Sequence, residues 1–121
     1  MNIMVLAQEF SVCKVADYSA VEPDIPFCFT GCTAEEKSLV CPTENVPENT
    51  LSREDGWRGF RICGTLDFSL IGILAKLSAA LAENGIGIFA VSTYNTDYIF
   101  TKSENFSRAL EVLAEKGYNI V

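Results

Sequence analysis

Hydrophobic residues in the second half of the chain follow a strand-like pattern first and a helix-like pattern next. Aromatic and branched apolar residues dominate residues 57–65, which is typical of a strand. Apolar residues then recur at three- and four-residue spacing over residues 69–84, which predicts an amphipathic helix. Asn84 and Gly85 close this stripe, because glycine tolerates the positive φ at which many helices end.

A similar alternation continues to the end of the chain. Residues 86–94 and 97–101 are rich in branched and aromatic side chains and predict two strands. A second helical stripe begins at Ser103 and ends at Gly117, and residues 118–121 predict a last short strand. The order is strand, helix, strand, strand, helix, strand. This order predicts an α+β, ferredoxin-like unit, in which two helices cover one face of a four-stranded antiparallel sheet.

The first half of the chain is less regular. Residues 10–16 alternate between apolar and polar side chains and predict a strand, and residues 25–33 and 38–41 predict a hairpin. No segment of this half carries a long helical stripe. The first half is therefore expected to be rich in β-structure, either as a degenerate copy of the ferredoxin-like plan or as an added sheet.

A polar segment separates the two halves. Residues 41–56 contain several residues that are common in turns and linkers, and all four prolines of the chain lie in the first half. We therefore place a boundary near residue 55. Residues 1–55 are expected to form a degenerate β-rich subdomain, and residues 56–121 the ferredoxin-like domain.

Charge and composition exclude several classes of function. The 121 residues include 9 basic and 16 acidic side chains, so the net charge is −7. An acidic chain is a poor partner for nucleic acid or for an anionic membrane surface. It has no run of about 18 apolar residues that could span a bilayer, and its first residues lack the positive start of a secretory signal.

The residue content also argues against most catalysis and metal binding. The chain has no histidine, which excludes an imidazole base or metal ligand. Its five cysteines are scattered, with a single close pair at Cys28 and Cys32, so we expect free buried thiols in a reducing cytoplasm and no zinc site. No glycine pattern matches a phosphate or dinucleotide motif. We therefore expect neither an enzyme nor a bound cofactor.

One candidate binding site is the loop that joins the strand at 57–65 to the following helix. Free N–H groups and the helix dipole favour an anion such as a carboxylate there. Gly72 would let a ligand approach the first helical turn closely. The alternative is structural, with Asp67 as a helix cap and Gly72 as a packing contact. The candidate residues of this loop are Asp67, Phe68, Ser69, Leu70, Ile71 and Gly72.

A second candidate site is the polar run between the two strands that follow. Asp97 could accept hydrogen bonds from an ammonium group, and Thr93 or Asn95 could orient the ligand. Ordinary turn chemistry is the alternative. We expect this run and the loop before the first helix to lie at opposite ends of adjacent strands, so that a second unit, from the first half or from a second subunit, would have to bring them together. The candidate residues here are Thr93, Tyr94, Asn95, Thr96 and Asp97.

Two stretches of the second half, residues 66–75 and 86–98, resemble the ACT-domain family. A looser match through residues 38–42 and 56–58 extends the resemblance over most of the chain. Within this family, the chain resembles small stand-alone proteins with two ACT units. These proteins are related to the cytosolic arginine sensors of animals and to the regulatory region of aspartate kinases.

The resemblance implies a regulatory protein without an attached enzyme that binds an amino acid at the seam between paired ACT units, and we expect it to be a homodimer. In the arginine sensors, the stretch that matches Thr93, Tyr94, Thr96 and Asp97 touches the ligand. Carried over, Asp97 would receive the ammonium group or a cationic side chain of the ligand, and the loop up to Gly72 would offer backbone groups. The alternative is a protein-interaction or dimerisation module without a small-molecule ligand.

Overall fold

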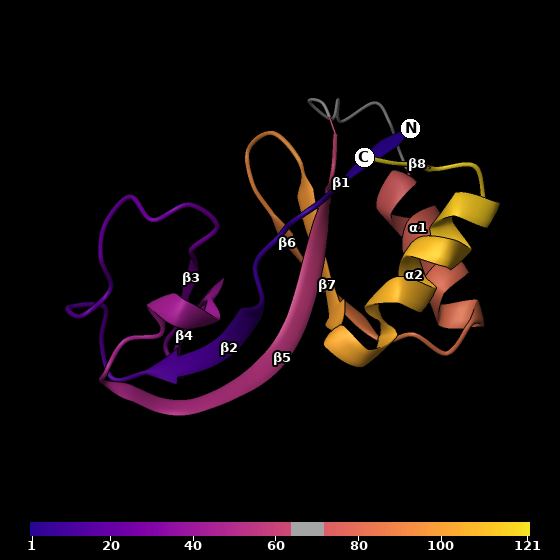
Figure 1. Cartoon of the computed structure of the whole chain (residues 1–121). Helices are drawn as coiled ribbons and strands as arrows, with labels where there is room; N and C mark the ends of the chain where they lie inside the picture. Colours follow the sequence, from indigo (N-terminus) through magenta and orange to yellow (C-terminus); the bar gives the residue numbers. More distant parts are fainter. Residues whose placement is uncertain (64–71) are drawn as a thin grey trace. The chain divides into compact units, whose positions relative to one another are not determined.

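The computed structural model describes residues 1–63 and 72–121 (Figure 1). Its contacts divide the chain into two compact units: Met1–Ala7 with Arg58–Val121, hereafter the C-terminal unit, and Gln8–Trp57, hereafter the N-terminal unit. The first seven residues therefore pack with the C-terminal unit. The division into domains at 1–55 and 56–121 stays a prediction. The elements are β1 (Asn2–Val5), β2 (Phe10–Val15), β3 (Phe29–Cys32), β4 (Lys37–Pro42), the 3-10 helix η1 (Thr43–Asn45), β5 (Thr50–Ile62), α1 (Ile73–Glu83), β6 (Ile88–Ser92), β7 (Asp97–Lys102), α2 (Ser103–Glu115) and β8 (Asn119–Ile120).

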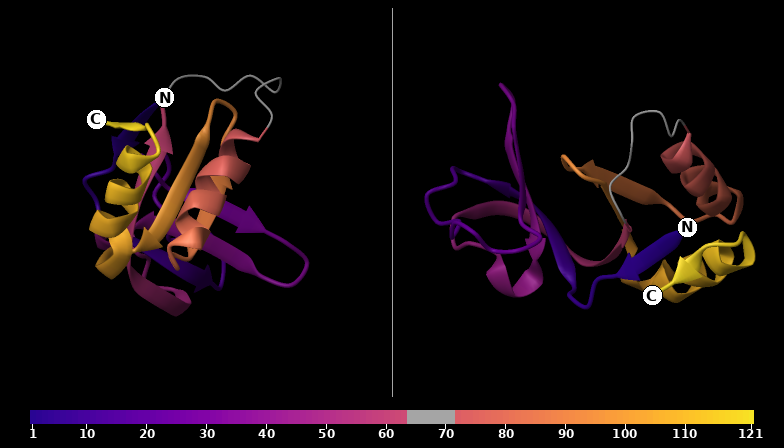
Figure 2. Two further views of the ribbon diagram at one scale, coloured as in Figure 1. Left: turned by 90° about the vertical axis from the view of Figure 1, so that its right-hand side faces the viewer. Right: turned by 90° about the horizontal axis from the view of Figure 1, so that it is seen from above.

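The C-terminal unit has the predicted α+β, ferredoxin-like fold. Its strands lie in the order β6-β7-β5-β1-β8, and both helices cover one face of this sheet (Figure 2). Apolar side chains of β1, β5, β7 and both helices form one core between the sheet and the helices. The helices supply the apolar stripes expected from the sequence, with Leu77 and Leu81 buried on α1 and Phe106 and Leu113 buried on α2.

The sheet of this unit contains one strand that the sequence pattern does not predict. β1 inserts between β5 and β8, pairing antiparallel with β5 and parallel with β8. Ile3 lies opposite Ile62 on one side and Ile120 on the other, and it is fully buried. The expected sheet of four antiparallel strands is therefore wrong. Only four residues form β1, which is too short for a periodic signal.

The first helix of the C-terminal unit begins later than its apolar stripe. α1 starts at Ile73, and Gly72 is its N-cap residue with a φ of 85°. At its other end, Gly85 has a φ of 72° directly after the C-cap residue Asn84, as predicted. The glycine that closes α2, Gly117, likewise has a positive φ.

The N-terminal unit is a sheet with the strand order β3-β4-β2-β5, antiparallel throughout. The strand expected over 10–16 and the expected hairpin are confirmed as β2 and as β3 with β4. A small core of Cys13, Val15, Leu39 and Cys41 lies on one face of this sheet. The first half is thus rich in β-structure, as expected.

The linker expected before residue 57 is wrong, because β5 begins at Thr50. Phe10 pairs with Trp57 and the next recorded pair joins Val12 to Glu54, so two residues of β5 oppose the single residue Ser11. One of these two is Gly56, whose φ of 85° suits a β-bulge. Residues 51–55 are exposed, so their polar composition is compatible with a strand at the surface of this unit.

Candidate functional site

The polar run between β6 and β7 forms a tight turn. Backbone N–H of Thr93 donates to the carbonyl oxygen of Thr96 at 2.9 Å, and the Thr93 hydroxyl donates to the same oxygen at 3.1 Å. The backbone N–H of Thr96 in turn donates to the Thr93 hydroxyl at 3.4 Å. Both groups of Thr93 therefore stabilise the turn itself, which is the turn chemistry that the sequence left open as the alternative.

Thr96 anchors this hairpin to the neighbouring strand. Its side chain is 6% exposed, and its hydroxyl donates to the carbonyl oxygen of Ile62 at 2.7 Å. Ile62 is the last residue of β5, and Thr96 directly precedes β7, which pairs with β5. The hairpin therefore lies at the end of β5 where the candidate loop begins. The expectation that the two sites lie at opposite ends is wrong, since β5 and β6 run in the same direction on either side of β7.

Asp97 is held by the residue opposite it across the hairpin. The register pairs Ser92 with Asp97, and the Ser92 hydroxyl donates to Asp97 Oδ1 at 2.6 Å. Asp97 is half-buried. A carboxylate can accept several hydrogen bonds, so this contact orients the group and leaves it capacity for a further donor. Ser92 was not among the candidate residues. Its place directly before the four-residue turn, opposite Asp97, could have indicated this contact.

The tip of the hairpin is open to solvent. Tyr94 is 97% exposed and Asn95 is exposed as well. A ligand role for these two side chains therefore calls for a second molecule or unit against the hairpin. Of the five predicted residues in this run, Thr93 and Thr96 stabilise the turn, Asp97 is oriented by Ser92, and Tyr94 and Asn95 face solvent.

Most of the other candidate loop lies outside the described residues. This holds for Asp67, Phe68, Ser69, Leu70 and Ile71. Gly72 is described: its carbonyl oxygen accepts the backbone N–H of Lys76 at 2.9 Å, and a Cβ built on it would meet no described atom within 4 Å. Glycine is therefore favoured here by the positive φ.

One cavity near the start of α1 was not predicted. It has a volume of about 240 Å³ and lies between the beginning of α1 and the end of α2. Lys76 and Lys116 reach it from the two helices and make it electropositive. Because these lysines are 40 positions apart in the sequence, no local pattern could have indicated it. Its lining residues are Met1, Ile73, Lys76, Lys116, Gly117 and Tyr118.

The cysteines are free, but not all of them are buried. Cys13 and Cys41 are buried, Cys28 and Cys63 are half-buried, and Cys32 is exposed, which corrects the expectation for that residue. Burial raises the pKa of the Cys41 thiol to about 12 and also raises the pKa of Cys13 and Cys28. In residues 1–63 and 72–121, no group of three or more potential ligands has the geometry to hold a metal ion.

Comparison with known families identifies the fold. A family model described as "ACT domain" matches residues 52–115, which is more than half of the chain. The chain therefore belongs to the ACT domain family, as its sequence resemblance implied. A search of curated proteins finds no match to this sequence.

Solved structures show the same fold over almost the whole chain. A crystal structure of a protein from Agobacterium tumefaciens is 25% identical, with a TM-score of 0.87 over 99% of this chain and 91% of the other. A Vibrio cholerae protein of unknown function, described as a possible transport protein, is 24% identical, with a TM-score of 0.70 over 94% and 88%. The ligand-free regulatory subunit of aspartate kinase from Thermus thermophilus is 11% identical, with a TM-score of 0.62 over 93% and 95%.

Membrane insertion through a helix finds no support in the described part of the chain. Neither α1 nor α2 is long and apolar enough to cross a bilayer.

Proposed function

We propose that this ACT protein is a non-catalytic regulatory protein that binds a free amino acid at the β6–β7 hairpin, at the seam between paired ACT units. The observation that carries the proposal is the hydrogen bond between Thr96 and Ile62, because it holds the hairpin beside the end of β5. An amino acid has a cationic and an anionic end. In the proposed site, the Asp97 carboxylate would bind the cationic end, and backbone groups at the start of α1 would bind the anionic end.

The proposed regulatory mechanism is a population shift. A ligand held at the seam contacts two ACT units, so it favours the packing of the units in which both contacts form. The protein would act in the cytoplasm as a homodimer, with a small-molecule amino acid as its ligand. The regulatory part of this proposal is supported by membership in the ACT family and by the similarity to a regulatory subunit of aspartate kinase.

A thermal-melt screen against the twenty amino acids tests the proposal. A ligand at about 100 times its dissociation constant stabilises the folded state by about 2.7 kcal/mol, which for a chain of this size raises the melting temperature by roughly 10 °C. We expect one amino acid, or a small related group, to give such a shift. The absence of a shift with every amino acid at millimolar concentration contradicts the proposal.

The Asp97→Asn variant tests the assigned residue. It removes the charge that would receive the ammonium group but keeps a similar shape. The apparent affinity for the amino acid, measured from the ligand-dependent shift in melting temperature, should therefore fall at least tenfold. Glu111→Gln, an exposed change of the same type on α2, is the matched control and should respond like the parent chain. Equal responses of the two variants would exclude Asp97 as the ammonium partner.

A dimerisation module without a small-molecule ligand is the second candidate function. It is favoured by the internal hydrogen bonds that Thr93 and Thr96 already make, and by β6, which among the described strands pairs with β7 alone. A free strand edge can pair with another chain. Sedimentation with and without amino acids separates the two functions: a dimer that is unaffected by amino acids and by Asp97→Asn supports the module.

A further inference from the structure

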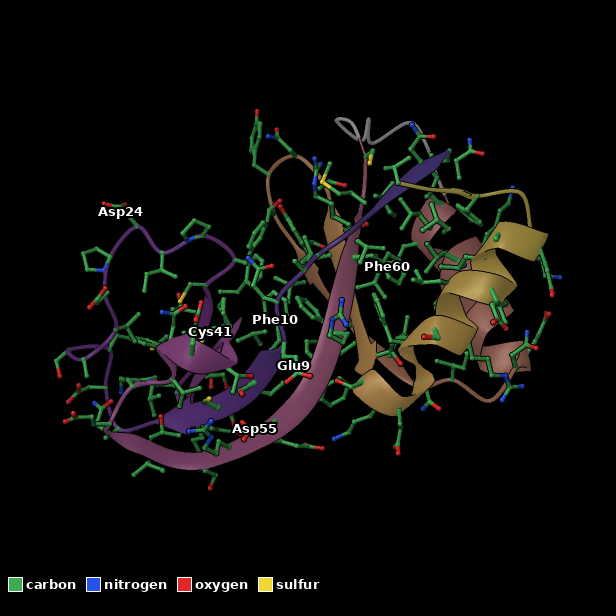
Figure 3. All side chains as sticks on the ribbon, in the orientation of Figure 1. Glu9, Phe10, Asp24, Cys41, Asp55 and Phe60 are labelled. Carbon is green, nitrogen blue, oxygen red and sulfur yellow. The ribbon has the colours of Figure 1, made fainter. Side chains whose placement is uncertain are left out.

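Three thiols share the small core of the N-terminal unit. Cys13 and Cys41 are 3% and 0% exposed, and the half-buried Cys28 packs against them. The thiols of Cys13 and Cys41 lie in the same core, close enough to each other and to Cys28 to interact electrostatically. Cys41, labelled in Figure 3, lies in β4. None of these cysteines belongs to the site proposed for the amino acid.

The strand register sets Cys28 opposite Cys41. In the β3–β4 hairpin, Phe29 lies across from Val40, so one further step places Cys28 across from Cys41. The Thr33 N–H donates to the Glu36 carbonyl oxygen at the turn, and hydrogen-bonded pairs alternate from there. Counting back from this turn makes Cys28 and Cys41 a non-hydrogen-bonded pair.

Positions of this kind suit a disulfide. The Cα atoms of a non-hydrogen-bonded antiparallel pair lie about 4.5 Å apart, which falls within the separation of about 4.4–6.8 Å found across disulfides. Cys13 is less suited, because the β2–β4 register sets it opposite Leu39 and therefore diagonal to Cys41. Both Cys28 and Cys41 contact the same core, so their side chains lie on the same face of the sheet.

We infer that Cys28 and Cys41 form a reversible intramolecular disulfide when the protein meets a hydroperoxide. The Cys28 sulfur attacks the peroxide O–O bond, forms a sulfenic acid and releases water or an alcohol. The Cys41 sulfur then attacks the Cys28 sulfur, and the hydroxyl of the sulfenic acid leaves with the Cys41 proton as water. One peroxide is reduced and two thiols are oxidised, and two cellular thiols restore the Cys28 and Cys41 thiols by exchange, becoming a disulfide themselves.

The order of the two steps follows from exposure. Cys28 is half-buried and reachable by a small peroxide, whereas Cys41 is fully buried. Burial raises the pKa of Cys28, which reduces its thiolate fraction and makes the first step slower than at an ordinary exposed thiol. The device would therefore respond to sustained oxidant and not to brief exposure.

The bond would join two segments that line one cavity. Cys28 ends the connection between β2 and β3, which contributes Ala20, Glu22 and Ile25 to a cavity of about 300 Å³. Cys41 lies just before η1 and the segment up to Glu48, which form the other side of that cavity. The disulfide would tie the β2–β3 connection to the segment that contains η1 and would restrict the movement of both.

Peptide mapping of the full chain tests the inference. The reduced protein is treated with hydrogen peroxide, remaining thiols are alkylated, and the digest is analysed by mass spectrometry. We expect a linked peptide pair containing Cys28 and Cys41, the loss of two hydrogen atoms from the intact mass, and reversal by dithiothreitol. A disulfide mapped to any other pair, or conversion of Cys28 to sulfinic acid without a link, overturns the inference.

One variant and one matched control make the test specific to Cys28. Cys28→Ser alters a half-buried position and should abolish the linked peptide, while Cys32→Ser, the exposed control, should leave it unchanged. In the parent chain, oxidation should raise the melting temperature by roughly 5–10 °C, because the link closes a loop of about 14 residues. An oxidised parent chain that melts at the same temperature as oxidised Cys28→Ser also overturns the inference.

Discussion

The Ser11 hydroxyl donates a hydrogen bond to Asp55 Oδ1 at 2.5 Å, across the bulge where Ser11 faces two residues of β5. Ser11 is fully buried, and its oxygen also lies 2.9 Å from the Thr43 hydroxyl. Arg53 reaches the same carboxylate oxygen from the solvent side at 3.0 Å. Ser11 thus links Asp55, labelled in Figure 3, to the start of η1. Four side chains, those of Ser11, Thr43, Arg53 and Asp55, are therefore connected at the bulge of β5.

Acid should weaken the N-terminal unit through this carboxylate. The hydrogen bond from Ser11, followed by that from Arg53, lowers the pKa of Asp55 below its ordinary value of 3.8. Because the folded-state pKa is the lower one, the stabilisation is fully present above the unfolded-state pKa and is lost as the pH falls through the folded-state pKa. We expect the denaturant concentration at the unfolding midpoint to decrease when the pH is lowered below about 4. The decrease should be smaller in Asp55→Asn. An unchanged pH dependence in that variant would contradict this prediction.

Replacing Ser11 with alanine should raise the pKa of Asp55 and destabilise the fold. The half-buried Thr43 hydroxyl loses its partner as well, and a hydrogen bond of this kind contributes roughly 0.5–1.5 kcal/mol. Urea unfolding measures the loss, and NMR titration of the carboxyl carbon follows the pKa. Ser107→Ala, an exposed serine on α2, is the control and should leave both quantities unchanged.

A methyl group at position 59 should damage the C-terminal unit. A Cβ at Gly59 would lie 2.7 Å from Phe100 Cδ1 and 3.2 Å from the carbonyl oxygen of Ile99, so the ring must move. Phe100 also stacks on Phe89 at 4.9 Å, which limits that movement. Gly59→Ala should therefore lower the free energy of unfolding by roughly 1–3 kcal/mol. Gly87→Ala has open space around its Cβ and should cost far less.

Thr96→Val should loosen the hairpin without changing its shape. The substitution keeps the branched side chain but removes the hydroxyl, which leaves the Ile62 carbonyl oxygen without this donor. We expect a loss of roughly 1–3 kcal/mol in stability and faster amide exchange in the β6–β7 turn. Asn95→Ala, at an exposed turn position, is the comparison. Equal exchange rates in the two variants would show that Thr96 does not anchor the hairpin.

Local signals account for the parts of the fold that could be predicted. The apolar stripe and the terminal Gly117 identified α2, and the strand-like segments 25–33 and 38–41 on either side of a turn at 33–37 identified the β3–β4 hairpin, because each depends on neighbours in sequence. β1 was missed, since the burial of Ile3 comes from partners in β5 and β8 that no local pattern reveals. The early part of β5 was missed because its exposed residues are polar and its bulge contains Gly56.

The candidate site was predictable in its residue types and not in its geometry. The polar run from Thr93 to Asp97 was visible, but the bond from Thr96 to Ile62 joins residues 34 positions apart. That single contact reverses the expected placement of the hairpin relative to the end of β5. The pairing of Ser92 with Asp97 likewise depends on the strand register. The register can be predicted only when the type of turn is known, because the turn type fixes it.

The position of β1 also determines when this sheet can be completed during synthesis. β1 lies between β5 and β8, and the Asn119 side chain donates to Asn2 across 117 positions of sequence. β1 therefore lacks one of its two partner strands until residues 119–120, which follow it by 117 positions, have been synthesised. Contacts so distant along the chain slow folding, so tagging or trimming near residues 119–120 should disturb assembly more than the small size of β8 suggests.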